Sequence, residues 1–194
     1  MDGRQRRAER SREAVVDAII AIYEEGELRP GAAMIAERAG LSERSVYRHF
    51  EDLEDLAAAA IERQRERIAP LLDAPPTVGS RHDRVLAIVD QRLRLHTKAI
   101  WVARAGQYVA VRSPVVEAAV ERRQQHQRAQ VLAHFATDLA RVPEPAASEV
   151  AQVLDLLLSI EGIDHLRLVS RLGRNQAHAA LVRAVEAVLD SVGA

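Results

Sequence analysis

The sequence predicts an all-α fold, and three features of its patterning and composition support that prediction. Apolar residues recur at intervals of three and four along most of the chain, which is the spacing of an amphipathic helix. The alternation of apolar and polar residues that is typical of strands, bounded by Gly or Asn-Gly turns, is missing. Aromatic residues, which favour strands, make up only 3% of the chain. We therefore expect helices nearly throughout.

Length and composition describe a soluble globular protein. The chain has 194 residues, of which 48% are hydrophobic and 28% charged, so a sizeable core is expected. It contains no cysteine, which excludes disulfides, thiolate metal sites and a cysteine nucleophile. No apolar run reaches the roughly 18 residues that a membrane span needs, and no apolar signal segment follows the first arginines. We expect a cytoplasmic protein with no membrane partner.

Residues 1–12 form a basic segment, although the formal net charge of the whole chain is only -1. Asp2 and Glu9 are the acidic residues of this segment. Its basic residues are all arginines, namely Arg4, Arg6, Arg7, Arg10 and Arg12. Two interpretations are open at this point: an arm that binds phosphate groups, or a disordered terminus that only improves solubility.

Two amphipathic helices are predicted at the N-terminal end of the chain. The first covers residues 9–25 and ends at Gly26, because glycine is common just past a helix C-terminus. The second begins after Gly31 and ends at Gly40, and Ile35 and the alanines beside it are spaced to pack inward. The second helix and the short helix that follows it both need neighbours to cover their apolar faces.

A third helix is predicted over residues 43–50, directly after a tight turn at Gly40. Ser42 is expected to cap this helix by accepting a hydrogen bond from a backbone N–H of its first turn. Val46 and Phe50 are four residues apart and give the helix an inward face. A helix, a glycine turn and a further helix are the parts of a helix-turn-helix.

The outward face of the third helix carries residue types that contact DNA. Arginine binds the O6 and N7 atoms of guanine, glutamate accepts from the N4 amino group of cytosine, and hydroxyls and histidine suit phosphate oxygens. The alternative interpretation is the ordinary solvated face of a surface helix. The outward-facing residues are Glu43, Arg44, Ser45, Tyr47, Arg48 and His49.

The segment around this turn closely resembles the N-terminal DNA-binding domain of the TetR family of bacterial transcriptional regulators. The resemblance covers residues 9–60 and rests on two runs in the family's order and spacing, IAERAGLS at residues 35–42 and SVYRHF at residues 45–50. It implies an all-α homodimer that binds a double-stranded operator and has a three-helix DNA-binding domain at residues 1–52. Residues 53–194 would form a helical effector-binding and dimerisation domain.

The resemblance also implies roles for single residues. The residues expected to face bases are Glu43, Arg44 and Ser45. Those expected to bind phosphates are Tyr47 and His49, while Arg48 would serve in either role. Ser42, which begins this helix, belongs to the same DNA-binding set. The resemblance implies a nucleoid-associated repressor that a small hydrophobic effector releases from a palindromic operator, with no cofactor and no enzymatic activity.

The sequence departs from the family pattern in two places. Pro30 and Gly31 stand where threonines often begin the second helix, so a side-chain cap and a phosphate contact are in doubt there. Leu53 stands where a lysine is common, inside the acidic run at residues 51–55, which removes another phosphate contact. The residues of the basic segment expected to supply the missing attraction are Arg4, Arg6 and Arg7.

Beyond residue 55 the periodicity alone predicts the helices. A fourth helix over residues 56–72 joins the DNA-binding domain, called the head below, to the rest of the chain, called the body. A linker rich in proline follows at residues 73–80. Further helices are predicted over residues 82–99 with a continuation through 111, and over residues 114–140, 146–172 and 175–192.

The predicted helix at residues 146–172 is apolar on two sides, so both sides must be covered. The second cover is either the last helix, which gives an intramolecular core, or another subunit. The resemblance favours a homodimer formed by the last two helices, with a two-fold axis that matches a palindrome. The residues expected at the interface are Val153, Leu156, Ile160, Ile163, Leu181, Val185 and Val188.

An effector pocket is expected among the helices between residues 56 and 168. Polar or aromatic residues inside apolar helical stretches are the candidates, although buried side chains of these types more often have a structural role. An effector would act by favouring a conformation in which the two heads are wrongly spaced for DNA. The candidates are His96, Trp101, Tyr108, Glu161 and His165.

Two other classes of protein remain as alternatives. One is a DNA-binding regulator that responds to no effector and has a filled body. The other is a metal-binding helical bundle enzyme, since Glu161 and His165 are four residues apart and would hold a metal if a third ligand converged on them. The motifs of common enzyme classes, GxSxG, GxGxxG, HExxH and the P-loop, do not occur. We therefore expect neither catalysis nor a metal site.

Overall fold

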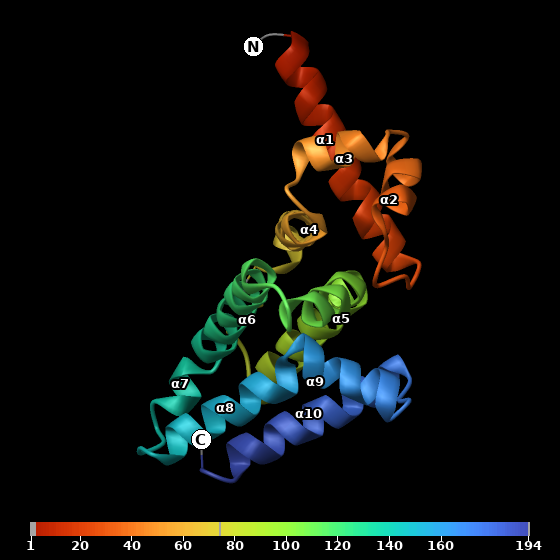
Figure 1. Cartoon of the computed structure of the whole chain (residues 1–194). Coiled ribbons are helices and arrows are strands. Elements are labelled where there is room, and N and C mark those ends of the chain that lie inside the picture. Colours follow the sequence, from red (N-terminus) through yellow and green to blue (C-terminus); the bar gives the residue numbers. More distant parts are fainter. Residues whose placement is uncertain (1–2, 74, 194) are drawn as a thin grey trace. The chain divides into compact units, whose positions relative to one another are not determined.

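The computed structural model describes residues 3–73 and 75–193, and every regular element in these ranges is a helix (Figure 1). The all-α prediction is confirmed. The chain divides into two compact units, which we call unit 1 and unit 2. Unit 1 comprises Met1–Arg67 and Trp101–Arg122, and unit 2 comprises Ile68–Ile100 and Arg123–Ala194. The functional division at residue 52 stays a prediction.

Unit 1 begins with the four N-terminal helices. They are α1 (Gly3–Glu24), α2 (Ala32–Ala39), α3 (Glu43–His49) and α4 (Leu53–Ile68). The predicted order of helices is correct, but α1 starts earlier than expected, so the described part of the basic segment forms its first turns. The fourth helix also starts earlier than predicted and ends at a short 3-10 turn, η1 (Ala69–Leu71).

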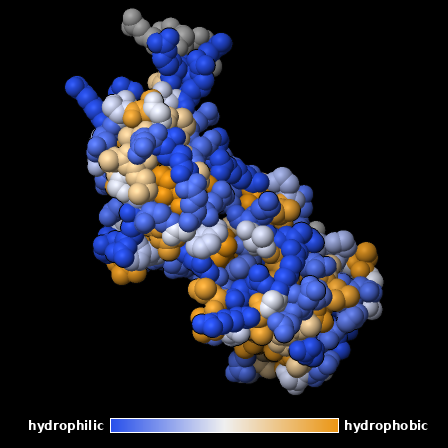
Figure 2. Space-filling model, turned by 90° about the vertical axis from the view of Figure 1, so that its right-hand side faces the viewer, coloured by the Kyte–Doolittle hydropathy of each residue, from blue (hydrophilic) through white to orange (hydrophobic). Residues whose placement is uncertain are grey.

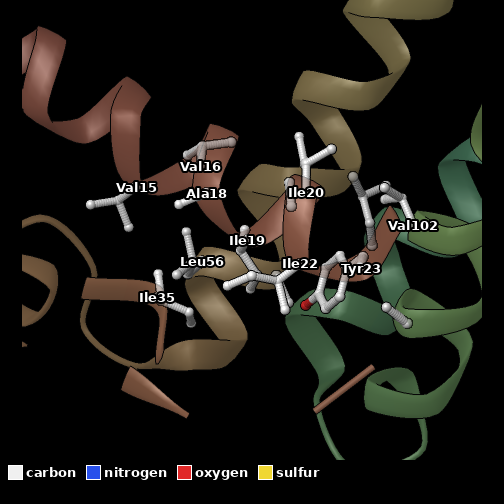
Figure 3. Packing of buried hydrophobic residues seen from close by; sticks show 14 of the residues in the cluster. Val15, Val16, Ala18, Ile19, Ile20, Ile22, Tyr23, Ile35, Leu56 and Val102 are labelled. Carbon is white, nitrogen blue, oxygen red and sulfur yellow. The ribbon is translucent and has the colours of Figure 1, made fainter. Parts of the chain in front are cut away.

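The core of unit 1 is built on the apolar face of α1. Val15, Ile19 and Ile22 are at most 2% exposed, and their spacing of three and four residues places them on one side of the helix. Figure 3 shows these side chains packed with Ile35 of α2 and Leu56 of α4. Truncating one of them to alanine is expected to cost about 2–5 kcal/mol of unfolding free energy. This packing fixes the short helices α2 and α3 on the long helix α1.

A 30-residue helix, α5 (Arg81–Ala110), contributes its first part to unit 2 and its last part to unit 1. The predicted continuation of this helix towards residue 111 is therefore correct. Val102 of α5 lies in the unit 1 cluster with Tyr23 of α1 (Figure 3). Tyr23 is 3% exposed, and this burial raises the pKa of its phenol above the usual range.

Unit 2 packs the first part of α5 with the C-terminal helices. These are α6 (Pro114–His134), α7 (Ala136–Leu139), α8 (Ala146–Leu158), α9 (Ile160–Asp164), the π-helical segment η2 (His165–Val169) and α10 (Arg174–Asp190). Its core contains Ile88 of α5, Val131 of α6, Leu154 of α8 and Leu181 and Val185 of α10, all at most 1% exposed.

The prediction of one helix over residues 146–172 is wrong, because the helix breaks at Ser159. This residue has an extended backbone (φ -71°, ψ 158°), and its Oγ accepts a hydrogen bond of 2.8 Å from the backbone N–H of Gly162. A Cβ at Gly162 would lie 2.2 Å from the carbonyl oxygen of Leu156. The serine cap starts a new helix, α9, and the glycine allows the close approach that the break requires.

Candidate nucleic-acid interface

The turn between α2 and α3 is closed by backbone hydrogen bonds at a left-handed glycine. Gly40 has φ 67° and ψ 33°, and its N–H donates to the carbonyl of Glu37 at 3.1 Å. The N–H of Leu41 donates to the carbonyl of Ala36, five residues earlier, at 2.9 Å, and the two bonds together form a Schellman-type helix end. Since a Cβ at Gly40 would meet nothing within 4 Å, the positive φ alone favours glycine here.

Ser42 begins α3 as the sequence predicts. Its backbone is extended (φ -87°, ψ 154°), and its Oγ accepts a hydrogen bond of 3.3 Å from the backbone N–H of Ser45. The hydroxyl groups of Ser42 and Ser45 also lie 3.1 Å apart and share a hydrogen bond. The N-terminus of α3 is therefore capped by a neutral group and keeps the partial positive charge of a helix start.

Two buried side chains anchor α3 to the core of unit 1. Val46 is fully buried and Phe50, just past the helix end, is 2% exposed. The guanidinium carbon of Arg12 on α1 lies 4.8 Å from the centre of the Phe50 ring, a cation–π contact across the head. These contacts fix which face of the short helix points outward.

The outward face of α3 carries the residues that the sequence predicts there. Glu43, Arg44, Tyr47 and Arg48 are exposed, and Ser45 and His49 are half-buried. Tyr47 is 51% exposed although it is a large aromatic residue. An exposed tyrosine flanked by two exposed arginines on a capped helix provides both hydrogen-bond donors and positive charge for an anionic partner.

The surroundings of His49 disfavour the charged form of its imidazole. Burial lowers the pKa of its imidazole, and the positive charges of Arg48 and Arg12 lower it further. Its Nε2 lies 3.4 Å from the Nη2 of Arg48. A neutral imidazole still donates one N–H to a phosphate oxygen but brings no positive charge.

The described arginines of the basic segment lie on the first turns of α1. Arg6, Arg7 and Arg10 are exposed, while the side chain of Arg4 lies outside the described residues. Figure 1 shows these turns projecting past α3, and Figure 2 shows hydrophilic residues around the same end. The described part of this segment, from residue 3 onward, is thus a helical extension of the head and not a separate arm.

The two departures from the family pattern lie at the starts of α2 and α4. Gly31 begins α2 with no side-chain capping bond. In the acidic run before α4, the Oδ1 of Asp52 accepts hydrogen bonds from the backbone N–H groups of Glu54 at 2.9 Å and Asp55 at 2.8 Å. This carboxylate caps α4, so its role in the fold explains an acidic residue on a surface expected to meet phosphate.

Trp101 and Tyr108, two of the expected effector ligands, belong to unit 1 and have partners there. The Tyr108 hydroxyl accepts a hydrogen bond of 2.9 Å from the Nη1 of Arg29. The guanidinium carbons of Arg29 and Arg112 lie 4.7 and 5.1 Å from the centre of its ring. Arg104 lies over the ring of Trp101 at 4.7 Å. Trp101 is half-buried and Tyr108 is exposed, and both rings already have arginine partners within the chain.

The other expected ligands belong to unit 2. His96 is 7% exposed, and its Nε2 lies 3.1 Å from a carboxylate oxygen of Asp164. Glu161 accepts a hydrogen bond of 2.6 Å from the Nη2 of Arg123, and His165 is exposed. Within the described ranges, no three histidine or acidic side chains are grouped to hold a metal ion.

The residues expected at the dimer interface differ in their exposure. Val153 and Leu156 on α8 are 41% and 64% exposed. The apolar residues Leu168 and Val169 on η2 are also exposed, at 57% and 64%. Val188 is half-buried. The remaining expected residues are at most 3% exposed inside unit 2 itself, and these are Ile160, Ile163, Leu181 and Val185.

Arg92 in unit 2 was not among the residues expected from the sequence to form a site. A single arginine in a charged helical stretch is normally solvated, yet this side chain is 2% exposed. A weak signal is its position four residues after Ile88 and four before His96, which places it on a face that carries buried residues.

The fold and the α2–α3 arrangement define a helix-turn-helix DNA-binding head joined to a helical body. Residues 15–60 match the family of bacterial regulatory proteins, tetR family. None of the curated proteins that were compared matches the chain. No helix within the described ranges has both the length and the apolar character needed to cross a membrane.

Solved structures of transcriptional regulators share the fold of the whole chain. A regulator from Rhodococcus sp. Rha1 has a TM-score of 0.72 at 19% identity, with 96% of this chain and 98% of that chain covered. A tetR-family regulator from Streptomyces coelicolor has a TM-score of 0.70 at 19% identity, with 95% and 82% covered. Another regulator from Streptomyces coelicolor A3(2) has a TM-score of 0.66 at 25% identity, with 92% and 98% covered. The chain thus has the DNA-binding domain and the fold of a TetR-family transcriptional regulator.

Proposed function

We propose that the protein is a sequence-specific repressor that binds a palindromic operator as a homodimer and is released by a small effector. The observation that carries the proposal is the surface of α3, where Val46 and Phe50 are buried and Arg44, Tyr47 and Arg48 are exposed. A helix held in this way presents its N-terminal side chains to the major groove.

The proposed contacts divide between bases and phosphates. Glu43, Arg44 and Ser45 lie in the first turn of α3 and are proposed to face base edges. Tyr47 and His49 are proposed to bind phosphates, with Arg48 in either role and Ser42 close to the backbone. The helical extension of α1 brings a second basic element, and the arginines proposed to bind phosphates there are Arg4, Arg6 and Arg7.

The proposed dimer uses the exposed apolar side chains of α8 and η2. Val153, Leu156, Leu168 and Val169 are each more than 40% exposed, and exposed apolar patches often mark protein interfaces. The buried residues of the expected interface would support this surface from within. Two copies related by a two-fold axis would present two α3 helices to two half-sites, which is the symmetry of a palindromic operator.

Selection of bound duplexes from a random DNA pool tests this function. The purified full-length protein is used at near-physiological salt, and its mass in solution is measured alongside. Enrichment of one palindrome by a dimer is the expected result. A variant with Arg44, Tyr47 and Arg48 all changed to alanine should fold with the same melting temperature and enrich nothing. Enrichment of the same sequence by this variant would show that α3 does not read the DNA.

A further inference from the structure

Arg92 is a buried cation whose hydrogen-bonding capacity is mostly unused. Its side chain is 2% exposed, and its Nη2 donates a bond of 3.1 Å to the backbone carbonyl of Gln127 on α6. Its Nε and Nη1 have no hydrogen-bond partner. Guanidinium donors in protein interiors are almost always paired, because an unpaired buried charge is costly. An arginine left in this state points to a partner that the isolated chain does not contain.

The charge of Arg92 is kept and is only weakly compensated. Burial lowers the pKa of its guanidinium to about 10, so the group is positive at neutral pH. The negative charge that acts on it comes from Asp155 on α8, whose own ion pair is with Arg128 at 3.7 Å. Burial raises the pKa of the Asp155 carboxyl, which weakens it as a counter-ion. One negative charge on a ligand would neutralise this guanidinium.

The surroundings of Arg92 suit a ligand with an apolar body. One turn before it on α5 lie Ile88 and Val89, and one turn after Gln127 on α6 lies Val131. All three are at most 1% exposed and belong to the core of unit 2. Arg92 is thus a charged side chain one helical turn from members of an apolar cluster, and a polar group among apolar residues is the usual composition of a small-molecule site.

We propose that Arg92 binds the carboxylate of a small monocarboxylic acid whose apolar part packs against the core of unit 2. The planar guanidinium matches a carboxylate through two parallel N–H bonds, and the single charge of the ligand equals the single charge to be neutralised. A phosphate dianion fits less well, because it carries two negative charges where the guanidinium supplies one positive charge.

The burial of Arg92 also indicates how such a ligand would act. Its Nε and Nη1 are closed off from solvent in this conformation, so the ligand binds only when the helices around Arg92 move apart locally. A ligand that binds one conformation better than another shifts the population towards it. The inference that this is the effector site of the repressor rests on the proposed function, whereas the binding of a carboxylate does not.

Calorimetric titration of the full-length protein without DNA tests the site. The probes are straight-chain carboxylates from butanoate to decanoate, the alcohols of the same length, and inorganic phosphate. We expect saturable binding of at least one carboxylate, at least tenfold tighter than its alcohol, and no binding of phosphate. Equal binding of acid and alcohol, phosphate binding at the same site, or no carboxylate binding at all would overturn the proposal.

Variants at position 92 separate a ligand contact from a structural role. Arg92→Met removes the charge and keeps an apolar side chain of similar length, so the fold is expected to persist, since buried ions are often replaced by apolar groups without loss of stability. Its affinity for the carboxylate should fall at least tenfold. Arg92→Lys keeps the charge without the planar fork, so its affinity for the carboxylate should fall less. Arg94→Met, at an exposed position of the same helix, is the matched control and should bind normally.

A separate measurement keeps this inference distinct from the proposed function. Normal operator binding by a protein that binds no carboxylate would overturn the Arg92 site alone. Carboxylate binding by a protein that enriches no DNA sequence would leave the site standing and overturn the repressor. Unchanged affinity of Arg92→Met for the carboxylate would also reject the inference.

Discussion

Arg44 and Tyr47 lie three residues apart on the exposed face of α3, and their truncation should have different consequences. Arg44→Ala should relax the base preference at one position of each half-site, at a cost of about 1–3 kcal/mol. Tyr47→Ala should weaken binding to all sequences alike, because a phosphate contact carries no base information. Competition binding with single-base variants of the selected duplex measures both. Equal, sequence-independent losses from the two variants would contradict this division of roles.

Gly162→Ala is expected to destabilise the protein, although alanine usually stabilises a helix relative to glycine. The new Cβ would lie 2.2 Å from the carbonyl oxygen of Leu156, so the break between α8 and α9 must rearrange. We expect a loss of about 1–3 kcal/mol in the free energy of unfolding, measured by urea denaturation. Gly31→Ala, where a Cβ meets nothing within 4 Å, is the control and should cost about 0.5 kcal/mol. A stability equal to that of the wild type would show that the break is not constrained by this glycine.

At the scale of single elements, the basic N-terminal turns of α1 should set part of the salt dependence of DNA binding. Arg6→Gln combined with Arg7→Gln should weaken operator binding and make its salt dependence less steep, by about 0.9 in the logarithmic slope for each lost phosphate contact. Filter binding between low and physiological salt measures this slope. Arg183→Gln, an exposed arginine on α10, is the control. The same slope in the double variant and the wild type would exclude a role for this segment.

The helices of the head could be predicted from the sequence because their signals are local. The cap at Ser42, the glycine at position 40 and the inward pair Val46 and Phe50 each act within one helical turn, and the structure has all of them. The apolar periodicity of residues 146–172 gave no sign of the break at Ser159, because a serine inside a helix and a serine cap look alike in sequence. What differs is the close approach of the chain at Gly162, which only the three-dimensional structure contains.

The candidate site was predictable to a similar extent. The exposed residues of α3 were identified because an anchored helix fixes which side faces outward. The partners of Tyr108 and His96 were not, since Arg29 and Asp164 are distant in sequence. Arg92 was not predicted either, because only the packing of the folded chain shows that an arginine is buried.

At the scale of the whole molecule, Leu156→Glu should convert the proposed dimer into a monomer. Leu156 is 64% exposed in the single chain, so a charge there is tolerated by the fold but not by an apolar interface. Operator affinity should fall with dimerisation, because each head alone contacts only one half-site. Sedimentation velocity reports the mass, and Val78→Glu, at a position that is 78% exposed in the linker, is the control and should remain dimeric. A Leu156→Glu protein that stays dimeric would place the interface elsewhere.

In the proposed complex two α3 helices, one from each protomer, read a palindrome in the major groove. Methylation protection of guanine N7, a major-groove atom, on the selected duplex tests this claim. We expect two protected regions related by the two-fold axis and about one helical turn, or a multiple of it, apart. Arg44→Ala should remove protection at the equivalent guanine of each region. Protection of a single region, or of none while the protein is bound, would contradict the claim.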